Sequence, residues 1–266
     1  MYVRTILVVI FYLLGVSFLN AQTIAPTLTA TGNQYYCPLS LQNIATSFSI
    51  TNPDNVEIKN IYIQISSGYV IGQDILKLNG TNPNVSASTF NILEGKLTLS
   101  WTGSGTAITS DLVNAVMNVV FESSSATPSG TRTFSITIGE ANYLPSTGHY
   151  YEYVPSVGIT WTAAKTAAEG RDYYGLNGYL ATITSADEAQ LSGKQAAGPG
   201  WIGGSDAAVE VTWRWVTGPE GMENGGLGRQ FWQGKWKNDG GTTTIPDNFA
   251  NWNTENNEPN DKGTEN

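Results

Sequence analysis

The stretch NWNTENNEPNDKGTEN, residues 251–266, decides how this chain is interpreted. It has neither the 3.6-residue period of a helix nor the two-residue alternation of a strand, so it predicts an irregular loop. Most of its side chains end in carboxylate or amide oxygens, which are the ligands that calcium prefers. Glu258 and Asn260 flank Pro259, and a cis bond before the proline would turn both side chains to one side of the loop. The alternative is a solvated polar loop, because Asn, Asp and Gly are common turn residues.

The N-terminus predicts a secretory signal peptide over residues 1–21. Met1 to Arg4 carries one positive charge, and an apolar run follows from Ile6 to Phe18. Ala21 then provides a small residue for cleavage before Gln22, which completes the signal-peptide pattern. A membrane anchor is the alternative, but the apolar run is short for a span of ~20 residues. We therefore expect a secreted or cell-surface protein with no stable membrane span after cleavage.

The composition narrows the possible functions. The chain has 22 Asp and Glu against 13 Lys and Arg, and this acidic balance argues against nucleic acid as a partner. Cys37 is the only cysteine, so an intrachain disulfide is excluded, and we expect this thiol not to be catalytic. His149 is the only histidine, which leaves little room for zinc sites or histidine-based catalysis.

Residues 22–148 predict an all-β sandwich. Apolar and polar residues alternate in several short runs, as they do in strands with one buried face. The predicted strands are 47–50, 61–65, 96–101, 118–121 and 133–138, and 110–116 predicts one short helix. Clusters of Asn, Pro, Asp and Gly separate these runs, and such spacing indicates a sandwich.

This first region resembles the cadherin-like sandwich modules of bacterial surface proteins. The matching residues are 72–78, 95–99 and the closing strand from Thr131. The acidic motifs with which cadherins bind calcium are not visible in this region. The resemblance therefore implies a spacer or adhesion module without a calcium site.

Residues 141–148 predict a linker, after which the composition changes. Thr160 predicts a helix N-cap, and Trp161, Ala164, Lys165 and Ala168 would share one helix face up to about Gly170. Ser185 and Glu188 form a capping-box pattern for a second helix through about Leu191. Further strands are predicted at 149–154, 178–183, 201–204 and 212–216, and residues 217–252 predict a long loop of the kind that is usually functional.

Residues 149–266 resemble a C-type lectin domain, so the resemblance implies an α+β fold with two helices, short antiparallel strands and a long irregular loop. The landmarks follow in the order of that family. They are Trp161 with Ala164 and Ala168, Leu180–Ile183 leading into Ser185 and Glu188, Trp201–Gly204, Trp213–Trp215, Asn251-Trp252 and Glu258–Asn260. The usual disulfides are absent, and the sequence stops before the Trp-Asn-Asp motif of the family, which indicates an incomplete domain. We expect Trp161, Trp201, Trp213, Trp215 and Trp252 to be packing residues rather than platforms for sugars.

The resemblance also implies two calcium sites. The principal, sugar-binding site would use Glu258, Asn260 and Glu265. The supporting site would use Asp206 and Glu210, completed by Asp261, Glu265 and Asn266. The alternative for Asp206 and Glu210 is ordinary solvated charge.

The implied function is calcium-dependent binding of carbohydrate in cell adhesion, not catalysis. In this family a Glu-Pro-Asn sequence favours mannose-type glycans, with vicinal sugar hydroxyls as calcium ligands. One alternative is a lectin-like module that binds a protein or another cell-surface component and uses calcium only structurally. A glycoside-acting enzyme is a further alternative, because carboxylates occur in pairs.

Overall fold

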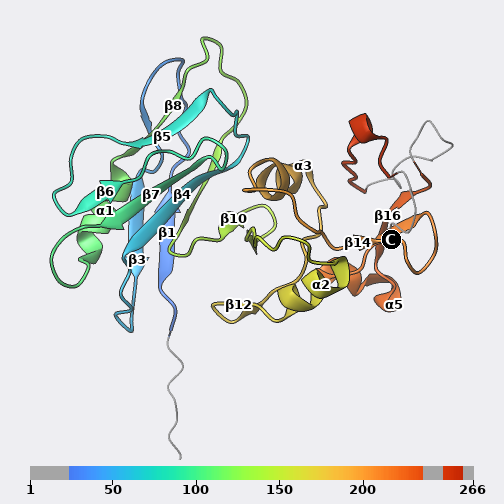
Figure 1. Ribbon diagram of the computed structural model, residues 1–266. Coiled ribbons are helices and arrows are strands. Elements are labelled where there is room, and N and C mark those ends of the chain that lie inside the picture. The colour runs from blue at the N-terminus through green and yellow to red at the C-terminus, as the bar shows by residue number, and fades with distance from the viewer. Residues whose placement is uncertain (1–23, 236–247, 260–266) are drawn as a thin grey trace, which may run out of the picture.

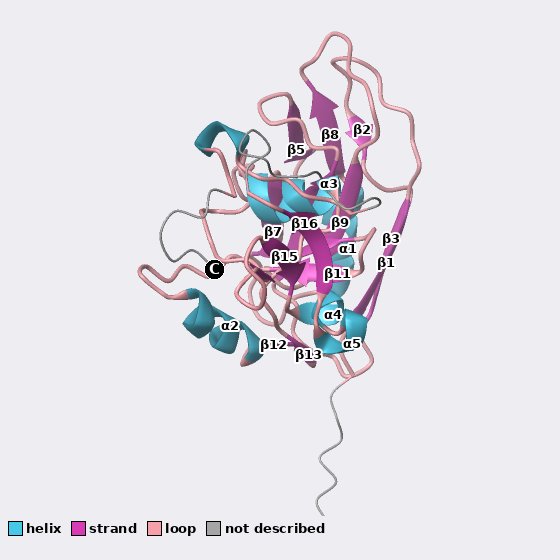
Figure 2. Ribbon diagram, turned by 90° about the vertical axis from the view of Figure 1, so that its right-hand side faces the viewer, coloured by secondary structure: helices cyan, strands magenta, loops and turns pink. Residues whose placement is uncertain are grey.

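The computed structural model describes residues 24–235 and 248–259, so the predicted signal peptide lies outside the described residues. Within them, the chain consists mostly of strands in several small antiparallel sheets, together with short helices (Figure 1, Figure 2). We call the described residues up to 148 the N-terminal unit and those from 149 onward the C-terminal unit, after the predicted boundary.

The N-terminal unit builds three sheets around one helix. Its elements are β1 (Thr27–Thr31), β2 (Gln42–Asn43), β3 (Ser47–Thr51), β4 (Asn60–Ser67), β5 (Asp74–Leu78), β6 (Val85–Ala87), β7 (Lys96–Trp101), α1 (Thr109–Met117), β8 (Val119–Ser123) and β9 (Thr133–Thr137). The largest sheet has the order β6-β7-β4-β9, a second has the order β2-β8-β5, and β1 pairs with β3. The predicted short helix and the predicted strands are confirmed, with ends shifted by at most two residues.

The core of this unit is built on the apolar residues at alternate positions of β4 and β7. Ile61, Ile63 and Ile65 on β4 are all 0% exposed, and Leu97 and Leu99 on β7 are equally inaccessible, because alternate residues of a strand face the same side. Side chains from β5, β8 and α1 join the same cluster. Two sheets and one helix thus share a single core, while the cadherin-like identity of this unit stays a prediction.

A buried ion pair ties the start of β5 to the segment before β9. The side chains of Arg132 and Asp74 are 4% and 0% exposed. The Nε of Arg132 donates to Oδ2 of Asp74 at 2.6 Å, and its Nη1 donates to the carbonyl of Ser129 at 2.6 Å. The backbone N–H of Val70 also donates to Oδ2 of Asp74, at 2.9 Å, and the ring of Tyr36 lies 5.7 Å from the guanidinium carbon. Both charges are therefore compensated inside the fold.

The predicted linker forms a β-hairpin. Strand β10 (Asn142–Leu144) pairs with β11 (His149–Tyr151), so Leu144 lies opposite His149. The side chain of Leu144 is 0% exposed, and β10 also contacts β4 and β9. The first half of the predicted linker is thus part of a packed strand, its second half is a largely exposed turn, and the division of the chain into two domains stays a prediction.

Two glutamines of the C-terminal unit reach into the N-terminal unit. Gln195 is 0% exposed, and its Nε2 donates to the carbonyls of Ile65 at 3.0 Å and Glu94 at 2.7 Å. The Nε2 of Gln190 donates to the carbonyl of Tyr69 at 2.9 Å. These hydrogen bonds from buried or part-buried amides join the two units.

The C-terminal unit has short elements and much irregular chain. After β11 they are α2 (Trp161–Glu169), β12 (Asp172–Tyr173), β13 (Leu176–Asn177), α3 (Ala186–Glu188), the π-helix η1 (Ala189–Lys194), β14 (Gly204–Ser205), β15 (Thr212–Trp215), α4 (Gly218–Gly221), α5 (Glu223–Gly226), β16 (Arg229–Gln233) and the 3₁₀ turn η3 (Thr254–Asn256). Strands β14, β15 and β16 form one sheet, and β12 pairs with β13.

Both predicted helices of this unit are confirmed at their starts. The side chain of Thr160 accepts a hydrogen bond from the N–H of Ala163 at 3.3 Å, and Ala164 is buried on the predicted face of α2. The Oγ of Ser185 accepts from the N–H of Glu188 at 3.2 Å, as the capping pattern predicts. The second helical segment continues as η1 to Lys194, three residues beyond the predicted end.

Three predictions for this unit need correction. Residues 178–183 are not a ladder strand; their carbonyls accept single bonds, at Leu180 from the Thr217 hydroxyl and at Ala181 from the Gly203 N–H. The predicted strand 201–204 is reduced to β14 (Gly204–Ser205), and Trp201, expected in the core, is 51% exposed. The predicted loop 217–252 contains α4, α5 and β16.

Candidate functional site

The turn between β14 and β15 holds the first pair of predicted calcium ligands. Asp206 is only 2% exposed, so it is not an ordinary solvated charge. Its Oδ2 accepts a hydrogen bond from the N–H of Val211 at 3.1 Å, and its carbonyl accepts from the N–H of Val209 at 3.0 Å. These bonds close the turn and fix the Asp206 carboxylate, while Glu210 in the same turn is exposed.

An aromatic cluster places the polar segment 251–259 on the sheet that carries this turn. The ring of Trp252 lies 4.9 Å from that of Trp213 on β15 and 5.8 Å from that of Phe231 on β16. Phe231 in turn stacks on Trp215 at 4.1 Å, and Trp215 is 3% exposed. Trp252 is therefore a packing residue, as expected, and it anchors the segment to β15 and β16.

The Glu258-Pro259 bond is cis, as the resemblance implies. The segment before it is folded back, because the N–H of Glu258 donates to the carbonyl of Asn253 at 3.1 Å. The other predicted ligands, Asn260, Asp261, Glu265 and Asn266, lie outside the described residues.

The donor chemistry of the described ligands suits calcium, but they do not form a complete centre. Asp206, Glu210 and Glu258 offer only oxygens, which is the ligand type of a hard cation. Within residues 24–235 and 248–259, no three His, Cys, Asp or Glu side chains gather closely enough to hold a metal ion. A calcium centre would thus need ligands from the segment that follows Pro259.

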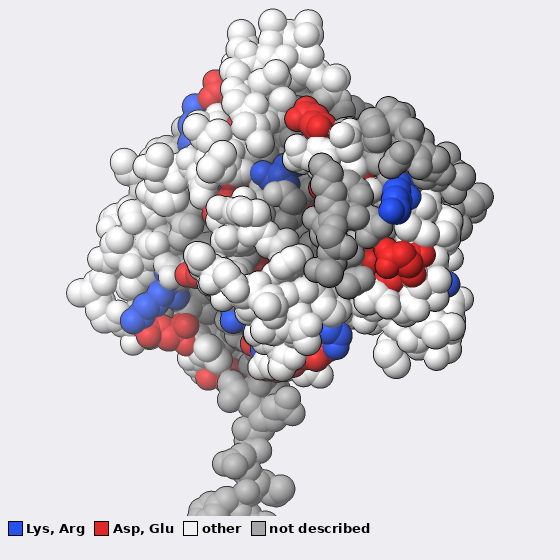
Figure 3. Space-filling view, turned by 45° about the vertical axis from the view of Figure 1, so that its right-hand side comes forward, with Lys and Arg blue, Asp and Glu red and all other residues white. Residues whose placement is uncertain are grey.

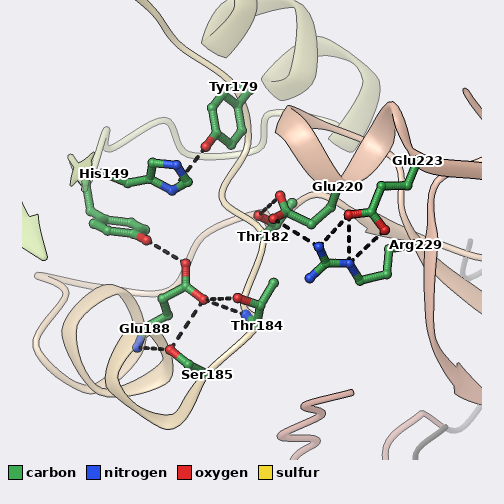
Figure 4. Close-up of polar contacts among 10 residues, drawn as sticks. His149, Tyr179, Thr182, Thr184, Ser185, Glu188, Glu220, Glu223 and Arg229 are labelled. Carbon is green, nitrogen blue, oxygen red and sulfur yellow. Dashed lines mark hydrogen bonds and ion pairs between the residues drawn. The ribbon is translucent and has the colours of Figure 1, made fainter. Parts of the chain in front are cut away.

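A buried polar network occupies the centre of the C-terminal unit (Figure 4). Glu188 is 2% exposed. One carboxylate oxygen accepts from the hydroxyl of Tyr151 at 2.6 Å, and the other accepts from both the N–H and the hydroxyl of Thr184, each at 2.6 Å. The Nδ1 of His149 lies 3.3 Å from the hydroxyl of Tyr179 (Figure 4). The network joins β11 to the second helical segment.

A second group of charged residues lies on the opposite side of Thr182 (Figure 4). The hydroxyl of Thr182 donates to the buried Glu220 at 2.8 Å, and Arg229 lies 3.9 Å from the same carboxylate. Arg229 also binds Glu223 through both Nε and Nη2. Hydrogen bonds from Arg229 lower the pKa of Glu223, and Glu223 raises the pKa of Arg229.

The two polar groups stabilise the fold and do not form a binding site. Each carboxylate is bonded to neighbours in the fold, and a cavity of only about 20 Å³ lies beside Arg229, room for roughly one water. In the sequence, the capping pattern of Ser185 and Glu188 indicated part of this network. Glu220 gave no such signal, because its partner Thr182 is distant in the sequence, and the Arg229–Glu223 pair spans six residues, which does not fit the period of a helix.

Burial raises the pKa of two tyrosines to about 12, and this predicts a loss of stability at high pH. Burial is the main cause at both Tyr69 and Tyr179; Asp74 adds to the effect at Tyr69, and Glu220 and Glu188 add to it at Tyr179. In the unfolded chain a tyrosine ionises near pH 10, so the folded state keeps these protons longer. Their contribution is fully present below pH 10 and is lost as the pH rises from about 10 to about 12.

Chemical denaturation between pH 8 and 12 would test this expectation, with phenolate absorbance followed in parallel. We expect the free energy of unfolding to be level until about pH 10 and then to fall. The Tyr179→Phe variant should show a shallower decline, because it lacks one of the shifted groups. A stability that rises above pH 10 would contradict the buried placement of these hydroxyls.

Comparison with known proteins gives one match. No protein-family model matches the chain, and no solved structure matches it. The chain is 34% identical over 197 residues to Halomucin of Haloquadratum walsbyi (strain DSM 16790 / HBSQ001), a match that covers 71% of this chain and 2% of Halomucin. The matched length exceeds either predicted unit, so residues of both units take part. The chain thus spans only a small part of the relative.

The described helices are all too short or too polar to cross a bilayer.

Proposed function

We propose that this chain is an extracellular, non-enzymatic protein that binds carbohydrate with calcium through its C-terminal unit. The name of the relative, Halomucin, refers to mucins and supports a place at the cell surface or outside the cell. The helix starts at Trp161 and Ala186, the strand at Trp213 and the cis bond at Pro259 all occur where the C-type lectin resemblance expects them. The cadherin-like identity of the N-terminal unit belongs to the same proposal, with that unit as a spacer in adhesion.

The observation that carries the proposal is the packing of Trp252. Its contacts with Trp213 and Phe231 place the segment that leads to Glu258 on the sheet whose β14–β15 turn holds Asp206 and Glu210. Acidic groups from two distant parts of the sequence are thereby attached to one small sheet. A cation bound between these carboxylates would offset the repulsion that their approach creates.

Two sets of residues would hold two calcium ions. Glu258, Asn260 and Glu265 would hold the principal calcium, and Asp206, Glu210, Asp261, Glu265 and Asn266 the supporting one. Bound calcium would accept two vicinal sugar hydroxyls as ligands. Each of these hydroxyls would also hydrogen-bond the protein, where the Glu258 carboxylate accepts and the Asn260 amide donates. The Glu-Pro-Asn sequence points to mannose-type glycans.

Calcium is expected to raise the melting temperature and to be required for retention on mannose-agarose. A cation that binds only the folded state stabilises it by about 2.7 kcal/mol at a hundredfold excess over its dissociation constant. The preparation must include residues 251–266, which carry most of the proposed ligands. Calorimetry and affinity chromatography, each with calcium and with EDTA, measure the two effects.

A substitution pair separates sugar recognition from structural calcium. Changing Glu258→Gln together with Asn260→Asp should shift the preference from mannose toward galactose, while Glu255→Gln on the exposed turn η3 serves as the matched control. Calcium stabilisation without sugar binding would favour a module that uses calcium structurally and binds a protein ligand. Mannose binding that persists in EDTA would exclude the calcium mechanism.

A further inference from the structure

The outer face of the largest N-terminal sheet carries a polar groove. Tyr62 on β4 and Thr98 on β7 are directly paired, and both point away from the core that their neighbours Ile61 and Leu99 fill. The groove has a volume of about 340 Å³, within the range of about 300–1,000 Å³ that is usual for small-molecule sites. Its lining consists of Tyr62, Ser88, Thr89, Asn91, Glu94, Lys96, Thr98 and Glu140.

The loop between β6 and β7 forms one wall of the groove. The Oγ of Ser88 accepts from the N–H of Thr98 at 3.0 Å, which joins the wall to the floor. The Oδ1 of Asn91 accepts from the N–H groups of Leu93 and Glu94 at 3.1 and 3.2 Å. Hydrogen bonds thus hold this wall in place without any ligand.

Lys96, Tyr62 and Glu140 form the other side. The side chain of Lys96 is only 14% exposed, and its Nζ lies 3.1 Å from Oε2 of Glu94 and donates to the carbonyl of Glu140 at 3.0 Å. The hydroxyl of Tyr62 donates to Oε1 of Glu140 at 3.2 Å. The polar groups of the groove are therefore fixed, and the charge of its lysine is compensated by a carboxylate.

A row of tyrosines borders the groove at Glu140. The ring centroids of Tyr143, Tyr150, Tyr173 and Tyr174 follow one another at 4.8, 5.0 and 4.9 Å. The hydroxyl of Tyr173 lies against Gly139, where an added Cβ would approach it to 2.0 Å, so a larger residue next to Glu140 would displace the Tyr173 ring. Tyr150 and Tyr174 are 40% and 60% exposed, which leaves aromatic surface open to a ligand.

The chemistry of the groove selects among possible ligands. Anions are disfavoured because two carboxylates face one lysine that is already paired. Purely apolar ligands are disfavoured because hydroxyl, amide and charged groups line the groove. On the described part of the face shown in Figure 3, Lys, Arg, Asp and Glu side chains are scattered among uncharged ones.

We propose that this groove and the tyrosines beside it bind a neutral saccharide without calcium. Hydroxyl groups of a sugar are both donors and acceptors, so they match the mixture of Thr98, Asn91 and Glu140. The apolar face of a pyranose ring would pack on an exposed tyrosine, which offers an apolar ring with a polar end. The groove lies on the N-terminal unit, and the tyrosines beside it come from both units. None of these residues belongs to the proposed calcium site, so binding here does not depend on that proposal.

Amide NMR titration in EDTA tests the site directly. The probes are D-glucose, D-mannose, D-galactose and N-acetyl-D-glucosamine, each titrated into the millimolar range, with a lysine-rich tripeptide as the competing class. We expect at least one sugar to perturb the amides of Thr98, Lys96 and Glu140 in a saturable way. Thr89→Trp should fill the groove from its exposed rim and weaken this binding at least about tenfold.

Two comparisons make the outcome decisive. Thr81→Trp places the same ring at another exposed threonine outside the lining and should leave sugar binding unchanged. Thr98→Val keeps the shape of the floor and removes one hydroxyl, so weaker binding by this variant supports the site even if Thr89→Trp folds poorly. Silence of these amides with all four sugars, or perturbation by the tripeptide alone, would overturn the proposal.

Discussion

Replacement of Glu188 by alanine is expected to lower the free energy of unfolding by about 3–5 kcal/mol. The change removes a carboxylate that accepts hydrogen bonds from Tyr151 and from both donors of Thr184. The side chain is 2% exposed, so water does not replace the lost partner, and the three donors are left unsatisfied in a buried place. Urea denaturation followed by tryptophan fluorescence measures the loss.

Two further variants assign this effect to the network. Tyr151→Phe removes a single donor and should cost about 1–2 kcal/mol. Glu169→Ala, at the exposed end of α2, should change stability by less than about 0.5 kcal/mol. If Glu188→Ala and Glu169→Ala cost the same, the Glu188 carboxylate is not the buried centre described above.

Removal of one partner of the Asp74–Arg132 pair should be nearly as damaging to the N-terminal unit. We expect Asp74→Ala to cost about 3–5 kcal/mol, because the Arg132 guanidinium, whose side chain is 4% exposed, loses its counter-charge. Removing both charges in Asp74→Leu with Arg132→Met should cost clearly less than the two single changes together, since no charge remains buried. Thermal and urea unfolding of Asp74→Ala, of the single variants Asp74→Leu and Arg132→Met, and of the double variant gives these values.

The exposed pair of Lys165 and Glu169 provides the control. Its side chains are 32% and 50% exposed and four residues apart on α2, so its loss should cost about 0.3–0.5 kcal/mol. Strict additivity of the single changes at Asp74 and Arg132 would contradict a coupled buried pair.

Local patterns predicted those elements whose stability comes from one clear periodicity. The alternation around Ile61 to Ile65 predicted β4, and the capping residues Thr160 and Ser185 predicted the starts of two helices. Strand β16 was not predicted, and a strand was wrongly predicted at 178–183. In both places the conformation depends on contacts with distant residues. The ring of Phe231 is buried against Trp215, and the Leu180 carbonyl is bonded to a side chain from α4's N-terminal flank, so neither pattern was visible along the chain.

The same distinction holds for the candidate site. The resemblance predicted that Asp206, Glu210 and Glu258 are calcium ligands, and these roles stay a prediction. It also implied the cis bond before Pro259, which the structure contains. The burial of Asp206 was not predictable, because it results from the Val211 N–H that closes the turn five residues later. The groove beside Tyr62 was missed as well, since its lining comes from strands β4 and β7 and from two loops that lie far apart in the sequence.

The buried hydrogen bonds of Gln195 limit how either unit of this protein could be exchanged for a unit of another protein. The buried amide of Gln195 belongs to one unit and the carbonyls of Ile65 and Glu94 belong to the other, so exchange of either unit alone would leave polar groups without partners. The similarity to Halomucin likewise runs through both units. Gene rearrangements that duplicate or transplant this region should therefore keep the N-terminal and C-terminal units together.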